Sequence, residues 1–258
     1  MSQYLIIPGR EHIEETLSLC EEYNLGLELN DFMFPKTLDD EENCGEMINF
    51  YKDLNAPIVT SHGDFFDVLV FSIDSKIAEI SKMRILQSME VSKKAGAKGV
   101  IFHSNIEPFL TAKMYRDNWC GKNEEVFREI CENYPEMNIY LENMFDTIPD
   151  DLARLGEKMK DVDNFGICFD YAHAYITDTP QEKWAEVLSP YIKHVHINDN
   201  DGMSDLHLAV GDGVIEWDQF YKLKEKFFND VTVLIETTPI DYQKRSLKFL
   251  QESGYLGK

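Results

Sequence analysis

The sequence predicts an α/β fold, a single (β/α)8 TIM barrel, on three observations. Short apolar runs alternate with longer amphipathic segments along the whole chain, and the alternation gives eight βα units. An open, doubly wound sheet usually has fewer strands and would leave edges, so eight units favour a closed barrel. The 258 residues can form one large core, and barrels of this class commonly have about this length. No linker or composition break interrupts the pattern, so we expect one domain over 1–258.

The expected strands are short runs rich in Val, Ile, Leu and aromatic residues. Strands of a parallel sheet are covered on both faces and therefore have nearly continuous apolar sequences. In chain order, the expected strands are 3–8, 25–30, 57–62, 98–103, 138–143, 165–170, 192–197 and 232–237.

The segments between the strands have helical spacing and recognisable ends. Residues 74–95 carry apolar side chains on one helical face, namely Ile77, Ile80, Ile85, Met89 and Val91. Gly96 follows as a helix stop. Pro149 and the two aspartates after it predict a helix start, and segment 216–218 predicts the start of a helix that runs to about Phe228.

The charge balance disfavours a nucleic-acid partner. The chain has 25 basic and 47 acidic side chains, which gives a net charge of −22. DNA affinity depends on lysine and arginine neutralising phosphates, and so large a negative charge repels phosphate polymers. The acidic residues also dominate the expected strand-following loops, where Asp31, Asp39, Asp40, Glu41, Glu42, Asp64, Asp67, Asp74 and Glu107 outnumber Arg10, Lys36, Lys113 and Arg116.

The remaining composition predicts a cytoplasmic protein with reduced thiols. No run approaches the roughly 20 apolar residues that cross a bilayer, and the N-terminal segment becomes charged before a signal-peptide core could form. The five cysteines are odd in number and include no C-x-x-C pair, so we expect structural thiols. They are Cys20, Cys44, Cys120, Cys131 and Cys168.

Potential metal ligands recur at the ends of the expected strands and in the loops that follow. Imidazole and carboxylate groups bind zinc, manganese and iron, and the carboxyl ends of barrel strands converge on one mouth. We therefore expect one metal centre, zinc or manganese, made by His62, His103, Glu142, Asp170, His173, His196, Asp205, His207 and Glu236.

Individual features of this set differ in how strongly they indicate a metal. Glu142 and Glu236 lie within apolar strands without a lysine or arginine nearby, and burying a carboxylate is costly unless a cation compensates. His194 and His196 share one face of a strand, so either could be the ligand; we choose His196, which lies nearer the mouth.

The glycines of VGDGVI (210–215) are expected to be turn residues, with a phosphate cradle as the alternative.

With these residues in view, the sequence resembles the xylose isomerase-like TIM barrel superfamily over nearly its full length. This superfamily includes a sugar phosphate isomerase/epimerase group and the endonuclease IV-like proteins of AP endonuclease family 2. The segments that carry the resemblance are SHGDFFDVLVFSID (61–74), KAGAKGVIFH (94–103), IYLENMFDT (139–147), FGICFDYAHAY (165–175), HVHINDNDGMSDLHLAVGDGVIEW (194–217) and LIETTP (235–240).

The resemblance implies a division of the nine ligands. Members with a single metal hold it with residues that match Glu142, Asp170, His196 and Glu236. Endonuclease-like members hold three zinc ions, and their added ligands match His62, His103, His173, Asp205 and His207. We therefore expect one to three divalent ions per chain, with Glu142 as a bridging carboxylate in a multinuclear site.

The resemblance implies a metal-dependent isomerase or epimerase that acts on a sugar or sugar phosphate. Proton transfer next to a metal-bound carbonyl would use Glu142 and Glu236 as the two bases, while His173 would contact a substrate hydroxyl or metal-bound water. Apolar walls could come from Phe65, Phe66 and Trp119, with packing as the alternative role. Arg10, Lys113 or Arg116 could hold a substrate phosphate.

Two alternatives stay open at the level of sequence. One is a multinuclear zinc phosphoesterase or endonuclease IV-like hydrolase, in which clustered ions activate water and clamp the phosphate oxygens. The other is a metal-stabilised barrel that binds a carbohydrate or a partner without turnover. A homodimer is compatible with every one of these functions.

Overall fold

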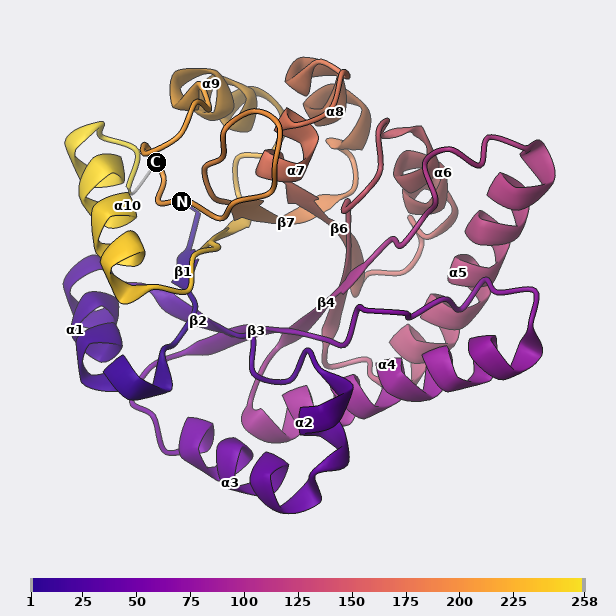
Figure 1. The fold of residues 1–258 in the computed structure, drawn as a ribbon, viewed down its shortest axis with the longest axis horizontal. Helices are drawn as coiled ribbons and strands as arrows, with labels where there is room; N and C mark the ends of the chain where they lie inside the picture. The colour runs from indigo at the N-terminus through magenta and orange to yellow at the C-terminus, as the bar shows by residue number, and fades with distance from the viewer. Residues whose placement is uncertain (1, 257–258) are drawn as a thin grey trace.

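Eight parallel strands close into a barrel whose strand order follows the chain (Figure 1). The computed structural model describes residues 2–256. The strands are β1 (Tyr4–Ile6), β2 (Gly26–Leu29), β3 (Ile58–His62), β4 (Gly99–His103), β5 (Asn138–Glu142), β6 (Phe165–Asp170), β7 (Ile192–Ile197) and β8 (Thr232–Ile235). Each expected strand range contains one observed strand, so the predicted (β/α)8 TIM barrel is confirmed.

The helices form a ring around the outside of the barrel (Figure 1). They are α1 (Ile13–Tyr23), α2 (Pro35–Asp39), α3 (Glu41–Lys52), α4 (Ser75–Ala95), α5 (Lys113–Asn133), α6 (Asp150–Lys158), α7 (Tyr171–Tyr175), α8 (Gln181–Leu188), α9 (Trp217–Phe227) and α10 (Ile240–Glu252), and a short 3-10 helix covers Arg10–His12. Two helices follow β2 and two follow β6. Within residues 2–256, no helix is both long enough and apolar enough to span a bilayer.

The predicted helix ends are confirmed and have identifiable caps. Helix α4 begins after Asp74, whose side chain accepts a hydrogen bond from the backbone N–H of Lys76, and it ends at Gly96 with φ of 99°. This left-handed conformation is one that glycine adopts at little cost. Helix α6 begins directly after Pro149, while α9 ends at Phe227, one residue before the predicted position.

Side-chain alternation along the strands separates an apolar outer layer from an interior that holds both polar residues and small apolar clusters such as that of Leu5 and Leu234. On β7, Val195 and Ile197 join the core between sheet and helices, whereas His194 and His196 point into the barrel beside Glu28. Successive side chains of a strand lie on opposite faces, so a strand buried on both sides can carry apolar and functional residues in turn.

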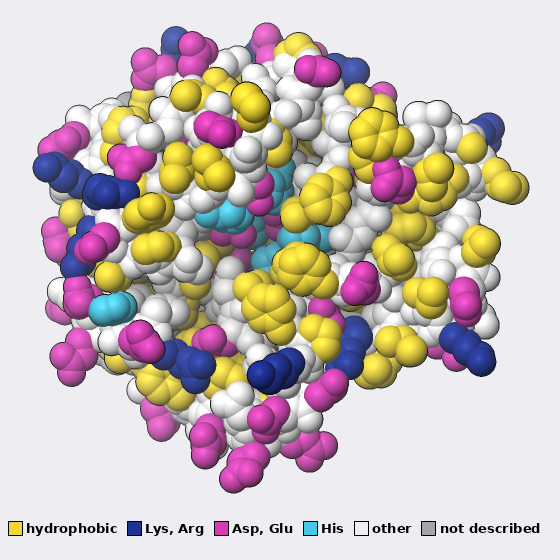
Figure 2. Space-filling view, viewed as in Figure 1, with side chains coloured by type: hydrophobic (Ala, Val, Ile, Leu, Met, Phe, Trp, Pro, Cys, Tyr) yellow, Lys and Arg dark blue, Asp and Glu magenta, His cyan; other side chains and the backbone are white. Residues whose placement is uncertain are grey.

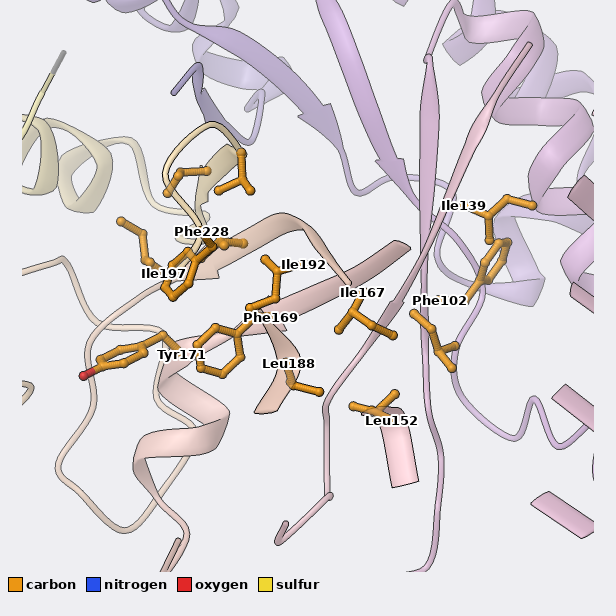
Figure 3. Packing of buried hydrophobic residues seen from close by; sticks show 14 of the residues in the cluster. Phe102, Ile139, Leu152, Ile167, Phe169, Tyr171, Leu188, Ile192, Ile197 and Phe228 are labelled. Atoms are coloured by element: carbon orange, nitrogen blue, oxygen red, sulfur yellow. The ribbon is translucent and has the colours of Figure 1, made fainter. Parts of the chain in front are cut away.

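The outer layer consists of one large hydrophobic cluster and a smaller one beside α3, and together they fix the strands in place. Figure 3 shows Ile167 and Phe169 of β6 directed toward Leu152 of α6 and Leu188 of α8, and all four side chains are fully buried. Each buried side chain of this size contributes roughly 1.5–3 kcal/mol of transfer free energy. Packing between the strands and the helices therefore fixes the positions of the side chains that point into the barrel.

Candidate metal centre

All nine predicted ligands lie at the carboxyl end of the barrel, and strand register brings several of them side by side. His103 is the pairing partner of Glu142 across β4 and β5, and Asp170 is that of His196 across β6 and β7. Figure 2 shows histidine and acidic side chains gathered in a hollow at the centre of this face. The hollow, which we call the mouth, has a volume of about 380 Å³; its lining includes His62, His103, His173, Asp205, His207 and Glu236.

Four of the nine residues form a buried group that we call the quartet: Glu142, Asp170, His196 and Glu236. One donor atom from each lies within 4.8 Å of those of the others. Nδ1 of His196 is 3.2 Å from a Glu142 oxygen and 3.5 Å from a Glu236 oxygen. Donor atoms this close to one another are near enough to share one divalent cation.

Glu142 also belongs to a second group, with His62 and His103. Its Oε2 atom lies 3.8 Å from Nε2 of His62 and 3.6 Å from Nε2 of His103. The two Nε2 atoms are 3.0 Å apart, so a proton or a cation has to lie between them. Burial lowers the pKa of His103 to about 3, which keeps this imidazole neutral, the form that binds metals.

A third group consists of His173, Asp205 and His207 at the rim of the mouth. An Asp205 oxygen lies 3.4 Å from Nε2 of His173 and 3.1 Å from Nε2 of His207. Asp205 and His207 come from the loop between β7 and α9, and His207 has the left-handed φ of 48°. The third group therefore depends on a loop conformation as well as on strand register.

Backbone carbonyls fix the orientation of three histidine rings. Nδ1 of His62 lies 2.9 Å from the carbonyl of Gly63, that of His173 lies 2.8 Å from Asn143, and that of His207 lies 3.0 Å from Glu236. A carbonyl oxygen only accepts, so each Nδ1–H donates, and Nε2 is the atom that has a free lone pair when the ring is neutral. Such contacts orient metal-binding histidines and set their tautomers.

Unsatisfied buried atoms provide a test of whether the site fits a metal. Both carboxylate oxygens of Glu142, Oδ2 of Asp170, Nε2 of His173 and Nδ1 of His196 are buried without a hydrogen-bond partner among the described residues. Buried polar atoms are normally paired, so a cluster of such atoms needs an explanation. Nitrogen and carboxylate donors directed at shared points fit zinc or manganese.

The titration behaviour of the site reflects its surplus of acidic groups. Burial would raise the pKa of Glu142 and of Glu236, but His196 and other neighbouring histidines hold both values below the ordinary range. Burial opposes charge on His207, yet Glu236 and Asp205 raise its pKa to about 10. The groups can therefore balance their charges by protonating imidazoles, and a bound cation would take over that role.

The sequence interpretation missed Glu28, a fully buried carboxylate on β2 inside the barrel. Its Oε2 accepts a hydrogen bond from Thr60 (2.6 Å) and lies 3.1 Å from Nε2 of His194, while Oε1 lies 3.3 Å from Nε2 of His196. The other nitrogen of His194 contacts Thr232 at 2.5 Å. The structure thus places His196, and not His194, within reach of Glu142 and Glu236. A carboxylate within an apolar strand was the available signal, as for Glu142.

Several residues considered for the mouth lie elsewhere, and for Trp119 the alternative role, packing, is confirmed. Trp119 is fully buried and its Nε1–H donates to the carbonyl of Ser104, because its helix turns it into the core. Arg116 pairs with Asp151, Lys113 with Asp117 and Arg10 with Asp31. No lysine or arginine of the described residues lines the mouth, whereas Phe65 and Phe66 do.

The glycines between β7 and α9 are turn residues, as expected. Gly211 has φ of 93°, and a Cβ added to Gly213 would lie 2.2 Å from the carbonyl oxygen of Asn200. The loop closes around Asp199, whose carboxylate accepts from the backbone N–H of Gly211 and of Ile215 and from Nε1 of Trp217. This closure holds the loop that carries Asp205 and His207.

The fold and the cluster together define a TIM barrel with a candidate metal site at its mouth, and sequence comparison gives the family. Residues 12–253 match the family described as xylose isomerase-like TIM barrel, and the chain belongs to this family. The uncharacterized protein MJ1311 of Methanocaldococcus jannaschii is 30% identical over 210 residues, which cover 75% of this chain and 69% of that protein.

Solved structures share the fold over nearly the whole chain. The TTHB071 protein from Thermus thermophilus, in a structure soaked with ZnCl2, is 23% identical with a TM-score of 0.78 over 100% of both chains. A D-tagatose 3-epimerase-like protein is 22% identical with a TM-score of 0.76, over 98% of this chain and 96% of that chain. At these identities the likeness shows the fold.

Proposed function

We propose that this protein is a divalent-metal-dependent enzyme that isomerises or epimerises a sugar or sugar phosphate. The carrying observation is the placement of Glu142, at the end of β5, and Glu236, directly after β8, whose carboxylates approach the same nitrogen of His196. Family membership and a structural neighbour named as D-tagatose 3-epimerase-like support sugar chemistry. A carbohydrate is thus the proposed substrate, and no nucleic-acid partner is proposed.

The quartet would hold the essential ion, zinc or manganese. A divalent ion bound there would polarise the substrate carbonyl and acidify the neighbouring C–H bond. Of the chain's own groups, one of Glu142 and Glu236 would remove the proton and the other would return it, as a two-base epimerisation requires. His173 would orient a substrate hydroxyl through Nε2, because its Nδ1 is already engaged by the carbonyl of Asn143.

Solvent exchange tests this proposal directly. Metal-loaded protein in D2O, given a panel of ketoses and sugar phosphates, should introduce deuterium at the carbon next to the carbonyl, as detected by NMR. Glu236→Gln should abolish the exchange, because an amide cannot accept the proton. Glu216→Gln is the matched control, since Glu216 is an exposed residue before α9 and does not line the mouth.

A second candidate is a multinuclear zinc phosphoesterase, and the two additional groups favour it. His62 and His103 share Glu142 with the quartet, while His173, Asp205 and His207 form a separate set. Elemental analysis separates the candidates: about one ion per chain supports the isomerase, and about three zinc ions support hydrolysis. Deuterium-inert protein that cleaves bis(4-nitrophenyl) phosphate would establish the second candidate and refute the first.

A further inference from the structure

We propose that a groove beside the mouth binds an uncharged apolar ring attached to the substrate, such as the aglycone of a glycoside. This inference rests on the proposed function, because the sugar part of the ligand would occupy the mouth. The groove, which we call the aromatic groove, has a volume of about 460 Å³. Its apolar walls include Phe65, Phe66, Phe71, Tyr115, Met144 and Phe145.

The aromatic groove and the mouth are adjoining compartments with a common wall. Phe65, Phe66 and Met144 line both. The ring centroid of Phe65 lies 4.3 Å from that of the candidate ligand His103 and 4.1 Å from that of Phe66. A molecule whose polar end lies at the quartet can therefore extend past these rings without leaving the protein surface.

Large apolar side chains in the aromatic groove are exposed to solvent, which is unfavourable when no ligand covers them. Phe66 is 55% exposed and Phe145 is 60% exposed, and both line this one cavity. Single exposed apolar residues are ordinary, whereas apolar side chains that converge on a cavity mark a binding site. Figure 2 shows hydrophobic side chains gathered directly beside the histidines of the mouth.

The charge of the lining selects against anionic ligands. No lysine or arginine of the described residues lines the aromatic groove, and its two charged residues are Asp67 and Glu107. A phosphate group placed here would meet like charge without a compensating cation. An uncharged ring gains burial against the phenylalanines and leaves the two carboxylates free to face water.

The groove is formed by the fold before any ligand arrives. The side-chain amide of Asn105 donates to the carbonyls of Phe65 (2.7 Å) and Val68 (3.1 Å), and so ties the loop after β4 to the loop after β3. Both loops contain left-handed residues, with φ of 47° at Asn105 and 58° at Asp67. Side chains held in this way lose little freedom when a ring binds.

Paired glycosides test the groove on zinc-loaded protein. We would measure affinities by calorimetry for 4-nitrophenyl and methyl glycosides of D-glucose, D-galactose and D-xylose. For at least one sugar, the nitrophenyl glycoside should bind about tenfold more tightly, from burial of its ring. Phe66→Ala and Phe145→Ala should each reduce that preference, whereas Phe109→Ala, 86% exposed and outside the groove lining, should leave it unchanged.

The result is independent of turnover and so separates two failures. Equal affinities within every pair, no detectable binding of any nitrophenyl glycoside, or a preference that survives both phenylalanine variants would overturn the groove. A retained preference in a protein that exchanges no deuterium would refute the isomerase and leave the groove standing. Exchange on unsubstituted sugars with equal glycoside affinities would refute the groove alone.

Discussion

Oε1 of Glu28 lies 3.3 Å from Nε2 of His196, while Nδ1 of the same ring faces Glu142 and Glu236. The two nitrogens of one imidazole therefore meet carboxylates on both sides. A proton on Nε2 would pair with Glu28 and leave the Nδ1 lone pair available to a cation. This arrangement is opposite to that of His62, His173 and His207, whose Nδ1 atoms meet carbonyls.

We expect Glu28→Gln to weaken zinc binding without unfolding the barrel. The amide has the shape of the carboxylate but not its charge, and removing such a partner of a metal-binding histidine typically costs about 10–100-fold in metal affinity. Competition with a chromogenic chelator measures the affinity, and thermal melting of the metal-free protein checks the fold. Ser61→Ala is the control, because this buried hydroxyl contacts the carbonyl of Leu29 and does not contact Glu28. Unchanged zinc affinity in Glu28→Gln would refute the role.

A pair of glycine substitutions tests how tightly the loop after β7 is closed. Gly213→Ala would place a Cβ 2.2 Å from the Asn200 carbonyl oxygen and 2.3 Å from a carboxylate oxygen of Asp199. We expect it to lower the free energy of unfolding by about 1–3 kcal/mol, as overpacking does. Gly45→Ala, in α3 with nothing within 4 Å, should instead raise it by roughly 0.5–1 kcal/mol. Urea denaturation measures both, and equal effects would contradict the close approach.

The environment of Asp146 leads us to expect a loss of protein stability as the pH rises. Burial raises its pKa to about 6 against a value of 3.8 for the ordinary group, although Ser104 donates a hydrogen bond to it. Between these values the folded state binds more protons than the unfolded state, so this group's contribution falls as pH rises from about 4 to about 6. Asp146→Asn should therefore stabilise the protein by about 1–2 kcal/mol at pH 8 relative to its effect at pH 4.

Urea denaturation of metal-free protein at the two pH values measures the effect of Asp146→Asn. The exposed Asp178→Asn provides the control for a change in net charge. An equal change in stability at both pH values would show that the Asp146 carboxyl titrates normally in the folded protein.

The loop after β3 should depend on the side chain and on the backbone of Asn105. Asn105→Ala loses two hydrogen bonds to this loop and also places alanine at φ of 47°, whereas Asn105→Gly loses the bonds alone. We expect amide hydrogen exchange of residues 65–71 to accelerate in both variants, and more in the alanine variant. Exchange rates equal to those of the unaltered protein would show that the hydrogen bonds of Asn105 do not stabilise the loop after β3.

The sequence was sufficient for the barrel and for the residues at its mouth, for a physical reason. Strands buried on both faces have continuous apolar sequences. A polar residue at the end of such a run is therefore easy to recognise in the sequence. Glu28 escaped because it lies within β2 and not at its end, and its burial depends on its partner His194, 166 positions away. The sequence left Trp119 open between the mouth and the core, because it does not show which face α5 turns inward; the structure places it in the core.

The geometry of the loop after β7 could not be predicted, since Asp199 closes it through contacts with residues up to 18 positions away. The roles of the nine residues as metal ligands stay predictions, as does the organisation of 1–258 as one domain.

The closure of that loop around Asp199 has a consequence for how this barrel could acquire new chemistry. The quartet is carried on or next to the strands, whereas Asp205 and His207 are carried by a segment that begins and ends at one carboxylate. Exchanging this segment would remove or replace two of the nine candidate ligands and leave the quartet, His62 and His103 in place. Variation of one loop could thus alter the third group without a change in the barrel strands.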